Sequence, residues 1–361
     1  MGLALALGAR GLGRTWPNPA VGAVVVRHED NRAVIVGRGW TQPGGRPHAE
    51  TQALARAGAA ARGATLYVTL EPCSHYGRTP PCADAVIEAG IAALVSALED
   101  PNPQVAGAGH RRVAAAGITV QVGTLAEQAR RAHAGHIRRI RDGRPHVMLK
   151  LAVSADDKIA LAGRKPVAIT GEAARARVHR MRAMSDAVLS GIGTVLADDP
   201  LLTCRLPGMA QRSPVRVVLD TKLRLGLAAR VVTSARKVPL WVLTSEQAPQ
   251  ERALSLQARG AAVLRVPIAN GTLDLKAALE LLAARGITRL MVESGPILAA
   301  ALLRADLIDE AALLRSAKTI GPLGIDALEG TPLEALTRSP KLAEIATEPL
   351  GEDLMTLFAR R

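Results

Sequence analysis

The sequence predicts an α/β protein, and two observations lead to that prediction. Short β-branched segments alternate with helical segments along the 361 residues, which is typical of helices layered on a sheet. Hydrophobic residues make up 48% of the chain and charged residues 22%, the balance of a globular protein with a buried core. Because aromatic residues contribute only 2%, we expect that core to consist of Ala, Val, Leu and Ile.

The first half of the chain contains one run of alternating elements. Two strands joined by a polar turn come first, and a helix then starts at His48 and closes at Gly63. The expected elements are strands at 21–26 and 34–39, a helix at 48–63, a strand at 65–70, a helix at 83–90, a strand at 91–100, a helix at 110–116 and a strand at 118–123. We therefore predict one domain over 1–123, followed by a basic linking helix over 124–145.

A second alternation begins at His146 and predicts a second α/β domain over 146–361, with no internal repeat of the first. Strands or strand–turn units come first, and helices and an edge strand follow. The expected ranges are 146–156, 186–200, 215–220, 238–244 and 261–267 for the strand units, 273–286 for a helix, 287–295 for a strand, 296–307 for a helix and 354–360 for a last edge strand.

Composition excludes several classes of protein. No apolar run approaches the roughly 18 residues of a membrane span. The opening letters MGLALALGARGLG lack the basic segment that precedes the apolar part of a signal peptide. Only three cysteines are present, too few for an extracellular disulfide framework. We therefore expect a cytoplasmic protein that has no membrane partner.

The formal net charge of +14 favours anionic partners. The basic residues are scattered, however. Their densest clusters, at 135–146 and 172–182, are not interleaved with aromatic residues as a platform for single-stranded nucleic acid would be. We therefore predict no nucleic-acid partner. An arginine-rich composition without functional meaning and sites for small phosphorylated ligands both remain open.

Two of the three cysteines, Cys73 and Cys82, lie in the stretch EPCSHYGRTPPC. A disulfide, a metal site and a pair of buried thiols are the alternatives. Upstream, the letters PHAE place His48 two residues before Glu50. One imidazole and two thiolates form a three-ligand set for Zn²⁺ that leaves a fourth position for water. Glu50 is then suited to carry protons beside the metal, as the glutamate of zinc deaminases does.

The spacing of the cysteines differs from the P-C-x-x-C of the general zinc-deaminase pattern, because eight residues separate them instead of two. Taken singly, H-x-E and a cysteine pair are weak signals. The order strand, strand, H-x-E helix, strand, Pro-Cys and helix favours the zinc site over two structural thiols and a histidine at a helix start.

Longer stretches carry a more specific resemblance. The chain closely resembles the bifunctional riboflavin-biosynthesis deaminase–reductase family in TWPNPAVGAVVV, GGRPHAE, GATLYVTLEPCSHYGRTPPCADAVIEAGI and EDPNPQVAGAGHRRVAAAGI. That family has the same long insert between its cysteines. The resemblance implies a cytidine-deaminase-like three-layer N-terminal domain, which deaminates 2,5-diamino-6-(5-phosphoribosylamino)pyrimidin-4(3H)-one by hydrolysis.

The same resemblance implies roles for particular residues of this domain. It assigns proton transfer to Glu50, and it implies that Asn18 and His75 contact the substrate. A turn role for Asn18 and a solvated loop position for His75 are the alternatives. The implied ligands of a single zinc ion are His48, Cys73 and Cys82.

The second domain resembles the reductase half of that family in LKLAVSADDKIA, SDAVLSGIGTVLADDPLLTCR and VESGPILAAALL. This implies a dihydrofolate-reductase-like α/β fold that reduces the ribosyl chain to ribityl with NADPH. No G-x-G-x-x-G follows a strand, so a Rossmann site is not indicated. The implied substrate contacts are Arg182, Leu202, Arg205 and Glu293. The implied NADPH contacts are Ala168, Thr194, Asp198, Thr221, Gly295, Pro296, Ile297, Leu298, Ala299, Ala300 and Ala301.

Other residues of this domain leave alternatives open. Lys150 is a candidate for polarising the sugar carbonyl, with a structural lysine as the alternative. The family usually has Asp-Gly where this chain has Asp156-Asp157, and a tryptophan where it has Ala168. A weakened or altered reductase is therefore an alternative to the full bifunctional enzyme. For Cys204 we expect only a packing role.

Two other classes of function compete with this one. A nucleic-acid deaminase would use the same zinc site, but it would favour the short cysteine spacing and leave the second α/β domain unexplained. A zinc-stabilised binding protein would have no reason to keep Glu50 beside the metal. For the favoured class we expect a phosphorylated pyrimidine as the ligand and a homo-oligomer, a dimer or higher, as the assembly.

Overall fold

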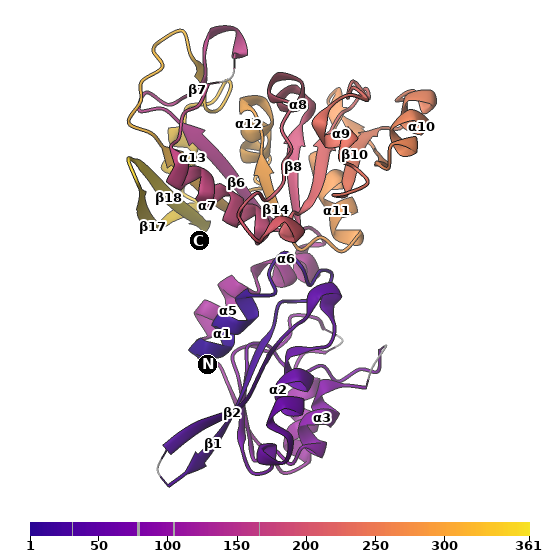
Figure 1. Ribbon diagram of the computed structural model, residues 1–361, viewed down its shortest axis with the longest axis vertical. Helices are drawn as coiled ribbons and strands as arrows, with labels where there is room; N and C mark the ends of the chain where they lie inside the picture. Colours follow the sequence, from indigo (N-terminus) through magenta and orange to yellow (C-terminus); the bar gives the residue numbers. More distant parts are fainter. Residues whose placement is uncertain (31, 78–79, 104, 166) are drawn as a thin grey trace. The chain divides into compact units, whose positions relative to one another are not determined.

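The chain forms two compact units, residues 1–143 and 144–361. Figure 1 colours the first from indigo to purple and the second from magenta to yellow. Each unit has its own sheet and its own apolar core, and the predicted α/β class is confirmed. The computed structural model describes residues 1–30, 32–77, 80–103, 105–165 and 167–361.

The first unit contains a five-stranded sheet with strand order β2-β1-β3-β4-β5. β1 pairs antiparallel with β2 and β3, whereas β3, β4 and β5 run parallel. Val24, Val25 and Leu66 are among the buried apolar residues of these strands, as expected for β-branched and aliphatic side chains on a packed sheet. The strands are β1 (Gly22–Glu29), β2 (Arg32–Trp40), β3 (Thr65–Val68), β4 (Ala93–Ser96) and β5 (Thr119–Val122).

The segment expected to be one linking helix contains two. His133 leaves helical geometry, with φ −97° and ψ 12°, and its Nε2 lies 3.0 Å from Thr69 Oγ1 after β3. The helices of this unit are α1 (Gly2–Ala9), α2 (Ala49–Ala57), α3 (Cys82–Glu88), α4 (Ala108–Ala115), α5 (Ala126–Ala132) and α6 (Ala134–Asp142), with 3-10 turns at Pro43–Gly45 and Gly58–Ala61.

Two glycines of β2 allow helix α2 to approach the strand closely. A Cβ on Gly37 would lie 2.2 Å from the carbonyl oxygen of Ala53, and a Cβ on Gly39 would lie 2.3 Å from that of Ala49. These neighbours are backbone atoms of a packed helix, so a larger residue would have to push the helix away. The position of the first turn of α2 therefore depends on Gly39.

The second unit is built on a nine-stranded sheet with strand order β11-β10-β9-β8-β14-β6-β15-β18-β17. The strands from β11 to β15 in this order run parallel. Next to them, β18 pairs antiparallel with β15, and β17 pairs antiparallel with β18. The strands of this sheet are β6 (His146–Val153), β8 (Ala187–Gly191), β9 (Val215–Leu219), β10 (Leu240–Ser245), β11 (Ala262–Val266), β14 (Arg289–Glu293), β15 (Glu310–Arg315), β17 (Leu342–Leu350) and β18 (Asp353–Arg360).

Two sequence predictions for this unit are wrong in detail. The strand expected at the edge, β18, is an inner strand, because β17 pairs with its outer side. Most side chains of β17 are exposed, so this strand has no apolar pattern that sequence reasoning could detect. Residues 186–200 hold the short strand β8 and then helix α8 (Ile192–Asp198), because the chain leaves the sheet after Gly191.

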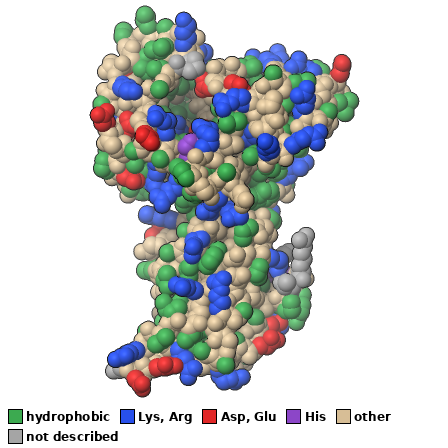
Figure 2. Space-filling view, viewed as in Figure 1, with side chains coloured by type: hydrophobic (Ala, Val, Ile, Leu, Met, Phe, Trp, Pro, Cys, Tyr) green, Lys and Arg blue, Asp and Glu red, His purple; other side chains and the backbone are tan. Residues whose placement is uncertain are grey.

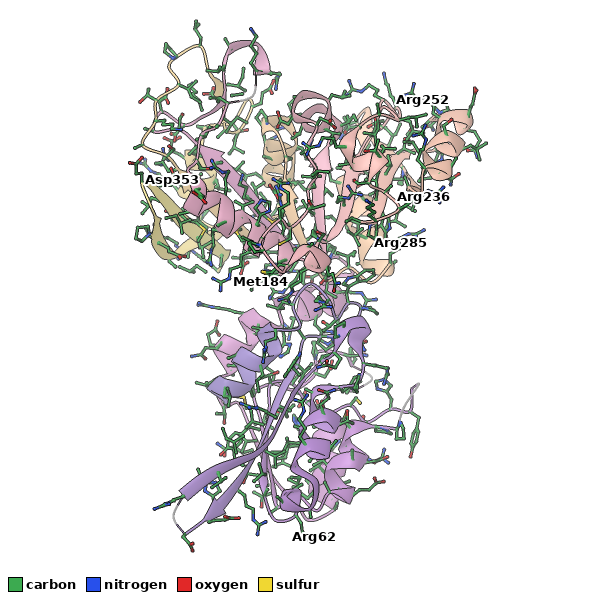
Figure 3. All side chains as sticks on the ribbon, viewed as in Figure 1. Arg62, Met184, Arg236, Arg252, Arg285 and Asp353 are labelled. Carbon is green, nitrogen blue, oxygen red and sulfur yellow. The ribbon has the colours of Figure 1, made fainter. Side chains whose placement is uncertain are left out.

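Helix α7 (Glu172–Ala183) is anchored at its start. The backbone N–H of Gly171, just before the helix, donates a 2.7 Å hydrogen bond to Asp353 Oδ2; Figure 3 labels Asp353 in the yellow part of the chain. The apolar residues Val178 and Met181 of α7 belong to the core of the unit. Both contacts fix α7 against the sheet, and with it the polar residues at its far end.

The remaining elements of the second unit surround this sheet (Figure 1). Among the described residues, none of the helices in either unit combines the length and the apolar character that crossing a bilayer requires. The other helices are α9 (Arg230–Thr233), α10 (Gln250–Ala258), α11 (Leu275–Ala284), α12 (Pro296–Arg304) and α13 (Glu334–Thr337), with 3-10 turns at Ala162–Arg164 and Ala210–Arg212. Two small sheets pair β12 (Ile268–Ala269) with β13 (Thr272–Leu273) and β7 (Lys158–Ala160) with β16 (Ile325–Asp326).

Parallel strands bring polar residues at their carboxyl ends to one edge of the sheet. Glu293, the last residue of β14, lies in register with Lys150 of β6. On its other side β14 pairs with β8. Ligands of open α/β sheets bind outside the carboxyl ends of the strands, so this edge is the expected site of chemistry in the second unit.

Candidate active sites

In the first unit, three side chains distant in sequence converge. His48 Nδ1 lies 3.3 Å from Cys82 Sγ and 3.7 Å from Cys73 Sγ, and the three ligand atoms lie within 4.8 Å of one another. All three cysteines of the chain are free, so the disulfide alternative does not hold. The structure brings together the three residues that the sequence suggested as zinc ligands.

Local structure explains how each ligand is placed. His48 has extended backbone angles and immediately precedes α2, and its carbonyl accepts a 2.9 Å hydrogen bond from Thr51 Oγ1. Cys82 is the first residue of α3, and Pro81 is the N-cap residue before it. Cys73 lies in the loop after β3, and its Sγ accepts a 3.3 Å hydrogen bond from the Cys82 backbone N–H.

The separations suit a tetrahedral zinc ion. With zinc–nitrogen and zinc–sulfur distances of about 2.1 and 2.3 Å, two such ligands are about 3.6 Å apart. The observed 3.3 and 3.7 Å lie on either side of that value. Both nitrogen–sulfur separations therefore suit a tetrahedral zinc ion, and a set of three protein ligands leaves the fourth position of a catalytic site open.

The electrostatics of the cluster also suit a divalent cation. A hydrogen bond from the Cys82 thiol holds the pKa of Cys73 at about 4, and the same contact raises the pKa of Cys82. Without a cation only one of the two thiols is therefore ionised at neutral pH. A divalent cation would favour the second thiolate and release its proton.

Glu50 lies in the first turn of α2 and is 3% exposed. Its Oε2 has no hydrogen-bond partner among the described residues, although a buried carboxylate oxygen normally has one. Burial raises the pKa of Glu50 to about 7. A buried, unpartnered carboxyl oxygen beside a three-ligand cluster is the arrangement that proton transfer to a bound molecule requires.

The two expected substrate contacts of this unit differ in their surroundings. Asn18 Nδ2 donates a 2.9 Å hydrogen bond to the carbonyl of Gly45, and Gly45 is so close that an added Cβ would lie 2.6 Å from that nitrogen. Asn18 therefore supports the loop that leads to His48. His75 is exposed in the loop between the cysteines. Part of that loop, residues 78 and 79, lies outside the described residues.

In the second unit, an ion pair marks the carboxyl edge of the sheet. Arg182 Nη2 donates a 2.8 Å hydrogen bond to Glu293 Oε2, and both side chains are 11% exposed. Burial alone would raise the pKa of Glu293, but Arg182 outweighs it and the pKa lies below its ordinary value. Burial lowers the pKa of Lys150, and Glu293 opposes that shift. Glu293 is thus ion-paired with Arg182 and interacts electrostatically with Lys150.

A hydrogen bond connects this ion pair to residues 202–205, the segment that contains two other expected substrate contacts, Leu202 and Arg205. Arg182 Nη1 donates a 3.0 Å hydrogen bond to the Thr203 carbonyl, and His179 Nδ1 lies 3.1 Å from the same oxygen. Thr203 sits between Leu202, which is buried with φ 54°, and the exposed Arg205. Sequence reasoning missed His179, although it precedes Arg182 by one helical turn on α7.

The expected cofactor contacts are joined only in part. The backbone N–H of Gly295, at the start of α12, donates a 2.8 Å hydrogen bond to Thr194 Oγ1, so residues 295–301 and Thr194 lie together. Among the described residues, no hydrogen bond links Asp198, Thr221 or Ala168 to this pair. Asp198 ends α8, Thr221 follows β9, and Ala168 precedes α7.

The third cysteine, Cys204, is 2% exposed, in line with a packing role.

Figure 2 shows Lys and Arg side chains spread over the visible face of both units rather than gathered in one stripe. A continuous basic groove, which would follow a nucleic-acid backbone, is not visible on that face.

Comparison with known proteins gives the class first. A family model described as the cytidine and deoxycytidylate deaminase zinc-binding region matches residues 1–98, and the RibD C-terminal domain matches residues 145–356. The chain is therefore a zinc-binding deaminase domain followed by a reductase domain.

Full-length relatives give the family. The Escherichia coli riboflavin biosynthesis protein RibD is 40% identical over 98% of this chain and 96% of its own length. The Acinetobacter baumannii RibD structure matches with a TM-score of 0.87 at 35% identity, over 100% of this chain and 97% of that one. The diaminohydroxyphosphoribosylaminopyrimidine deaminase/5-amino-6-(5-phosphoribosylamino)uracil reductase of Thermotoga maritima matches with a TM-score of 0.84 at 36% identity, over the same shares. The chain belongs to the RibD family of riboflavin biosynthesis proteins.

Proposed function

We propose that this protein catalyses two consecutive steps of riboflavin biosynthesis, one in each unit. The first is the hydrolytic deamination of a diaminopyrimidinone that carries a phosphoribosylamino group. The second is the NADPH-dependent reduction of the ribosyl chain of the deaminated product. The observation that carries the first activity is the buried, unpartnered Glu50 Oε2 beside the cluster of His48, Cys73 and Cys82.

In the deaminase unit, His48, Cys73 and Cys82 would hold one zinc ion, which when bound would lower the pKa of water and so supply a nucleophile at neutral pH. Glu50 takes a proton from the attacking water and delivers it to the ring nitrogen. It then takes the remaining proton of the added hydroxyl group, as the carbonyl forms and the carbon–nitrogen bond breaks, and delivers it to the amine, which departs as ammonia. Burial of Glu50 excludes competing solvent from this transfer.

Substrate orientation in this unit is assigned to Asn18 and His75. Because Asn18 Nδ2 is engaged with the Gly45 carbonyl, its amide oxygen is the atom offered to a ring N–H. His75 is exposed beside Cys73, where a mobile substrate group would meet it.

In the reductase unit, bound NADPH would supply a hydride to the sugar carbon. Arg182, Arg205 and Glu293 bind the substrate, with the arginines suited to a phosphate or hydroxyl groups. Lys150 lies next to Glu293 in the sheet and is assigned to donate a proton to the sugar oxygen. The N-terminus of α12, with Gly295, is assigned to a cofactor phosphate.

A two-step assay on the full chain tests both halves. Metal analysis should find one zinc per chain, and ammonia release should precede NADPH oxidation when the diaminopyrimidinone is supplied. Glu50→Gln should retain zinc and lose at least 100-fold in ammonia release, the typical contribution of a general acid/base. It should still oxidise NADPH with the deaminated product. Deamination that survives Glu50→Gln would contradict the mechanism.

Location and assembly stay predictions. A cytoplasmic location is consistent with three free cysteines, since thiols remain reduced there. A homo-oligomer is expected, and light scattering of the purified chain measures it directly.

A further inference from the structure

Backbone N–H groups at the start of helix α4 donate hydrogen bonds to a buried glutamate that lies just before Cys73. Glu71, two residues before Cys73, is buried, and its Oε1 accepts hydrogen bonds from the N–H groups of Gly109 and His110 at 2.7 and 3.2 Å. Its Oε2 accepts two more, from Asp100 and Gly107, at 3.0 Å each. Both oxygens are thus occupied by backbone donors. Glu71 therefore anchors the loop to α4.

The contact between α4 and this loop is also sterically close. A Cβ on Gly109 would lie 2.0 Å from the carbonyl oxygen of Pro72. Only glycine allows the helix backbone to come so near the residue before Cys73. The start of α4 is therefore a fixed platform beside the metal-binding loop.

From this platform, Arg112 reaches both cysteine-bearing segments. Its Nη1 donates a 3.2 Å hydrogen bond to the carbonyl of Ser74, the residue after Cys73. Its Nη2 lies 2.6 Å from Asp84 Oδ1, and Asp84 is in the first turn of α3, which begins with Cys82. One planar guanidinium thus joins the two segments, a geometry that a lysine cannot reproduce.

The long insert leaves room for such a link. In P-C-x-x-C the two cysteines are adjacent along one turn, so local backbone geometry sets their separation. Here eight residues intervene, and two backbone hydrogen bonds join the segments instead: Cys82 N–H donates to Cys73 Sγ at 3.3 Å, and Ala83 N–H donates to the Cys73 carbonyl at 3.1 Å. Arg112 adds a side-chain link from α4, outside the insert, to these two contacts.

We propose that Arg112 is a positioning residue of the zinc site: it ties the Cys73 loop to the helix that carries Cys82 and so holds the two thiolates at the separation the metal requires. This inference rests on the zinc site of the proposed function. Arg112 is 39% exposed in its side chain, and exposed ion pairs of this kind add little to folding stability. Groups that orient metal ligands nonetheless typically change metal affinity by about 10- to 100-fold.

Zinc affinity of the full chain, measured by competition with a chromogenic chelator, tests the proposal. Arg112→Met should weaken zinc binding by about 10-fold and leave the thermal unfolding of the metal-free protein unchanged. Arg111→Met is the matched control. Arg111 is the neighbouring arginine on α4, and its Nη2 bonds to the Ala106 carbonyl rather than to either cysteine segment. The Arg111→Met variant removes the same positive charge, and its zinc affinity should stay within about twofold of that of the unmodified protein.

A second variant keeps the test independent of any one substitution. Asp84→Ala removes the other end of the link and should weaken zinc binding to a similar extent. The double variant Arg112→Met/Asp84→Ala should bind zinc only slightly more weakly than either single variant. Each single variant already breaks the connection that the double variant breaks. Cobalt(II) added in place of zinc should give an altered visible spectrum in the Arg112 and Asp84 variants and an unchanged one in Arg111→Met.

Three results would overturn the proposal. The first is normal zinc affinity in Arg112→Met, and the second is an equal loss in Arg111→Met, which would indicate a general charge effect. The third is fully additive losses in the double variant. An unmodified chain that binds no zinc would instead contradict the zinc site itself, so the two failures are distinguishable.

Discussion

The guanidinium of Arg315 donates a hydrogen bond to the carboxylate of Asp157, a residue whose backbone has a φ of 63°. This angle lies in the left-handed region that suits glycine, and aspartate is one of the few other residues that tolerate it. The backbone at Asp157 therefore has a conformation that glycine also adopts. Loss of the glycine that is usual in the family is no reason by itself to expect a weakened reductase.

Replacement of Asp157 tests this interpretation. Asp157→Gly relieves about 1 kcal/mol of left-handed strain and loses an exposed ion pair worth about 0–1 kcal/mol, so we expect little change in stability and an NADPH oxidation rate within about twofold. Asp157→Val should destabilise the unit by about 1–2 kcal/mol, because a β-branched residue opposes this φ. Thermal unfolding and an NADPH assay measure both. A several-fold faster Asp157→Gly enzyme would favour the weakened-reductase alternative.

Gly39 should be required for the zinc site although it touches no ligand. The added methyl of Gly39→Ala meets the Ala49 carbonyl and displaces the first turn of α2, which carries His48 and Glu50. Misplacement by about 1 Å can cost about 100-fold in rate, so we expect at least a 10-fold loss of ammonia release and weaker zinc binding. Gly2→Ala is the control, since a Cβ there meets nothing. Equal behaviour of the two variants would count against this account.

Glu293, which is ion-paired with Arg182 and lies in register with Lys150, gives a third prediction. Lys150→Met should lower NADPH oxidation by at least 100-fold if Lys150 donates a proton to the sugar oxygen, while ammonia release stays normal. Glu293→Gln should raise the KM for the deaminated substrate, because it removes the carboxylate that pairs with Arg182. Steady-state assays of both activities check this. A Lys150→Met enzyme with normal reduction would leave Lys150 with a structural role only.

A buried ion pair at the start of β6 gives a pH-dependent prediction. Arg144 donates to both oxygens of Asp309, at 2.6 and 2.9 Å, and Val147 N–H donates to one of them. Burial alone would raise the pKa of Asp309, but the hydrogen bonds from Arg144 outweigh it and the pKa lies below its ordinary value. The stabilisation is therefore present above the unfolded-state value of about 3.9 and is lost as the pH falls through the folded-state pKa.

Asp309→Asn should lower the stability of the second unit at neutral pH by about 3 kcal/mol, because it leaves Arg144 buried without its counter-charge. The difference between the variant and the unmodified protein should shrink as the pH falls through the folded-state pKa of Asp309, because the native carboxyl then also becomes protonated. Urea unfolding at neutral pH and over a series of decreasing acidic pH values measures the difference. A difference that stays constant over the series would show that the carboxylate charge is not its source.

The sequence by itself identified the three side chains that cluster as candidate metal ligands in the first unit, and the class of the fold. His48 and Glu50 are two residues apart at the start of one helix, and each cysteine follows a proline beside a predicted element. Such signals are local, and alternating strands and helices are read from short windows in the same way. The α/β class could therefore be predicted, and so could the residues offered to the metal.

Only the tertiary structure decided which distant residues meet. Arg182 and Glu293 are 111 residues apart, and Arg112 reaches Ser74 across 38. These contacts depend on the order of strands in each sheet and on the close approach of helices at glycines such as Gly39 and Gly109. Local periodicity does not encode strand order, which is set by the packing of the whole domain. For the same reason the exposed edge strand β17 and the left-handed Asp157 could be found only in the folded chain.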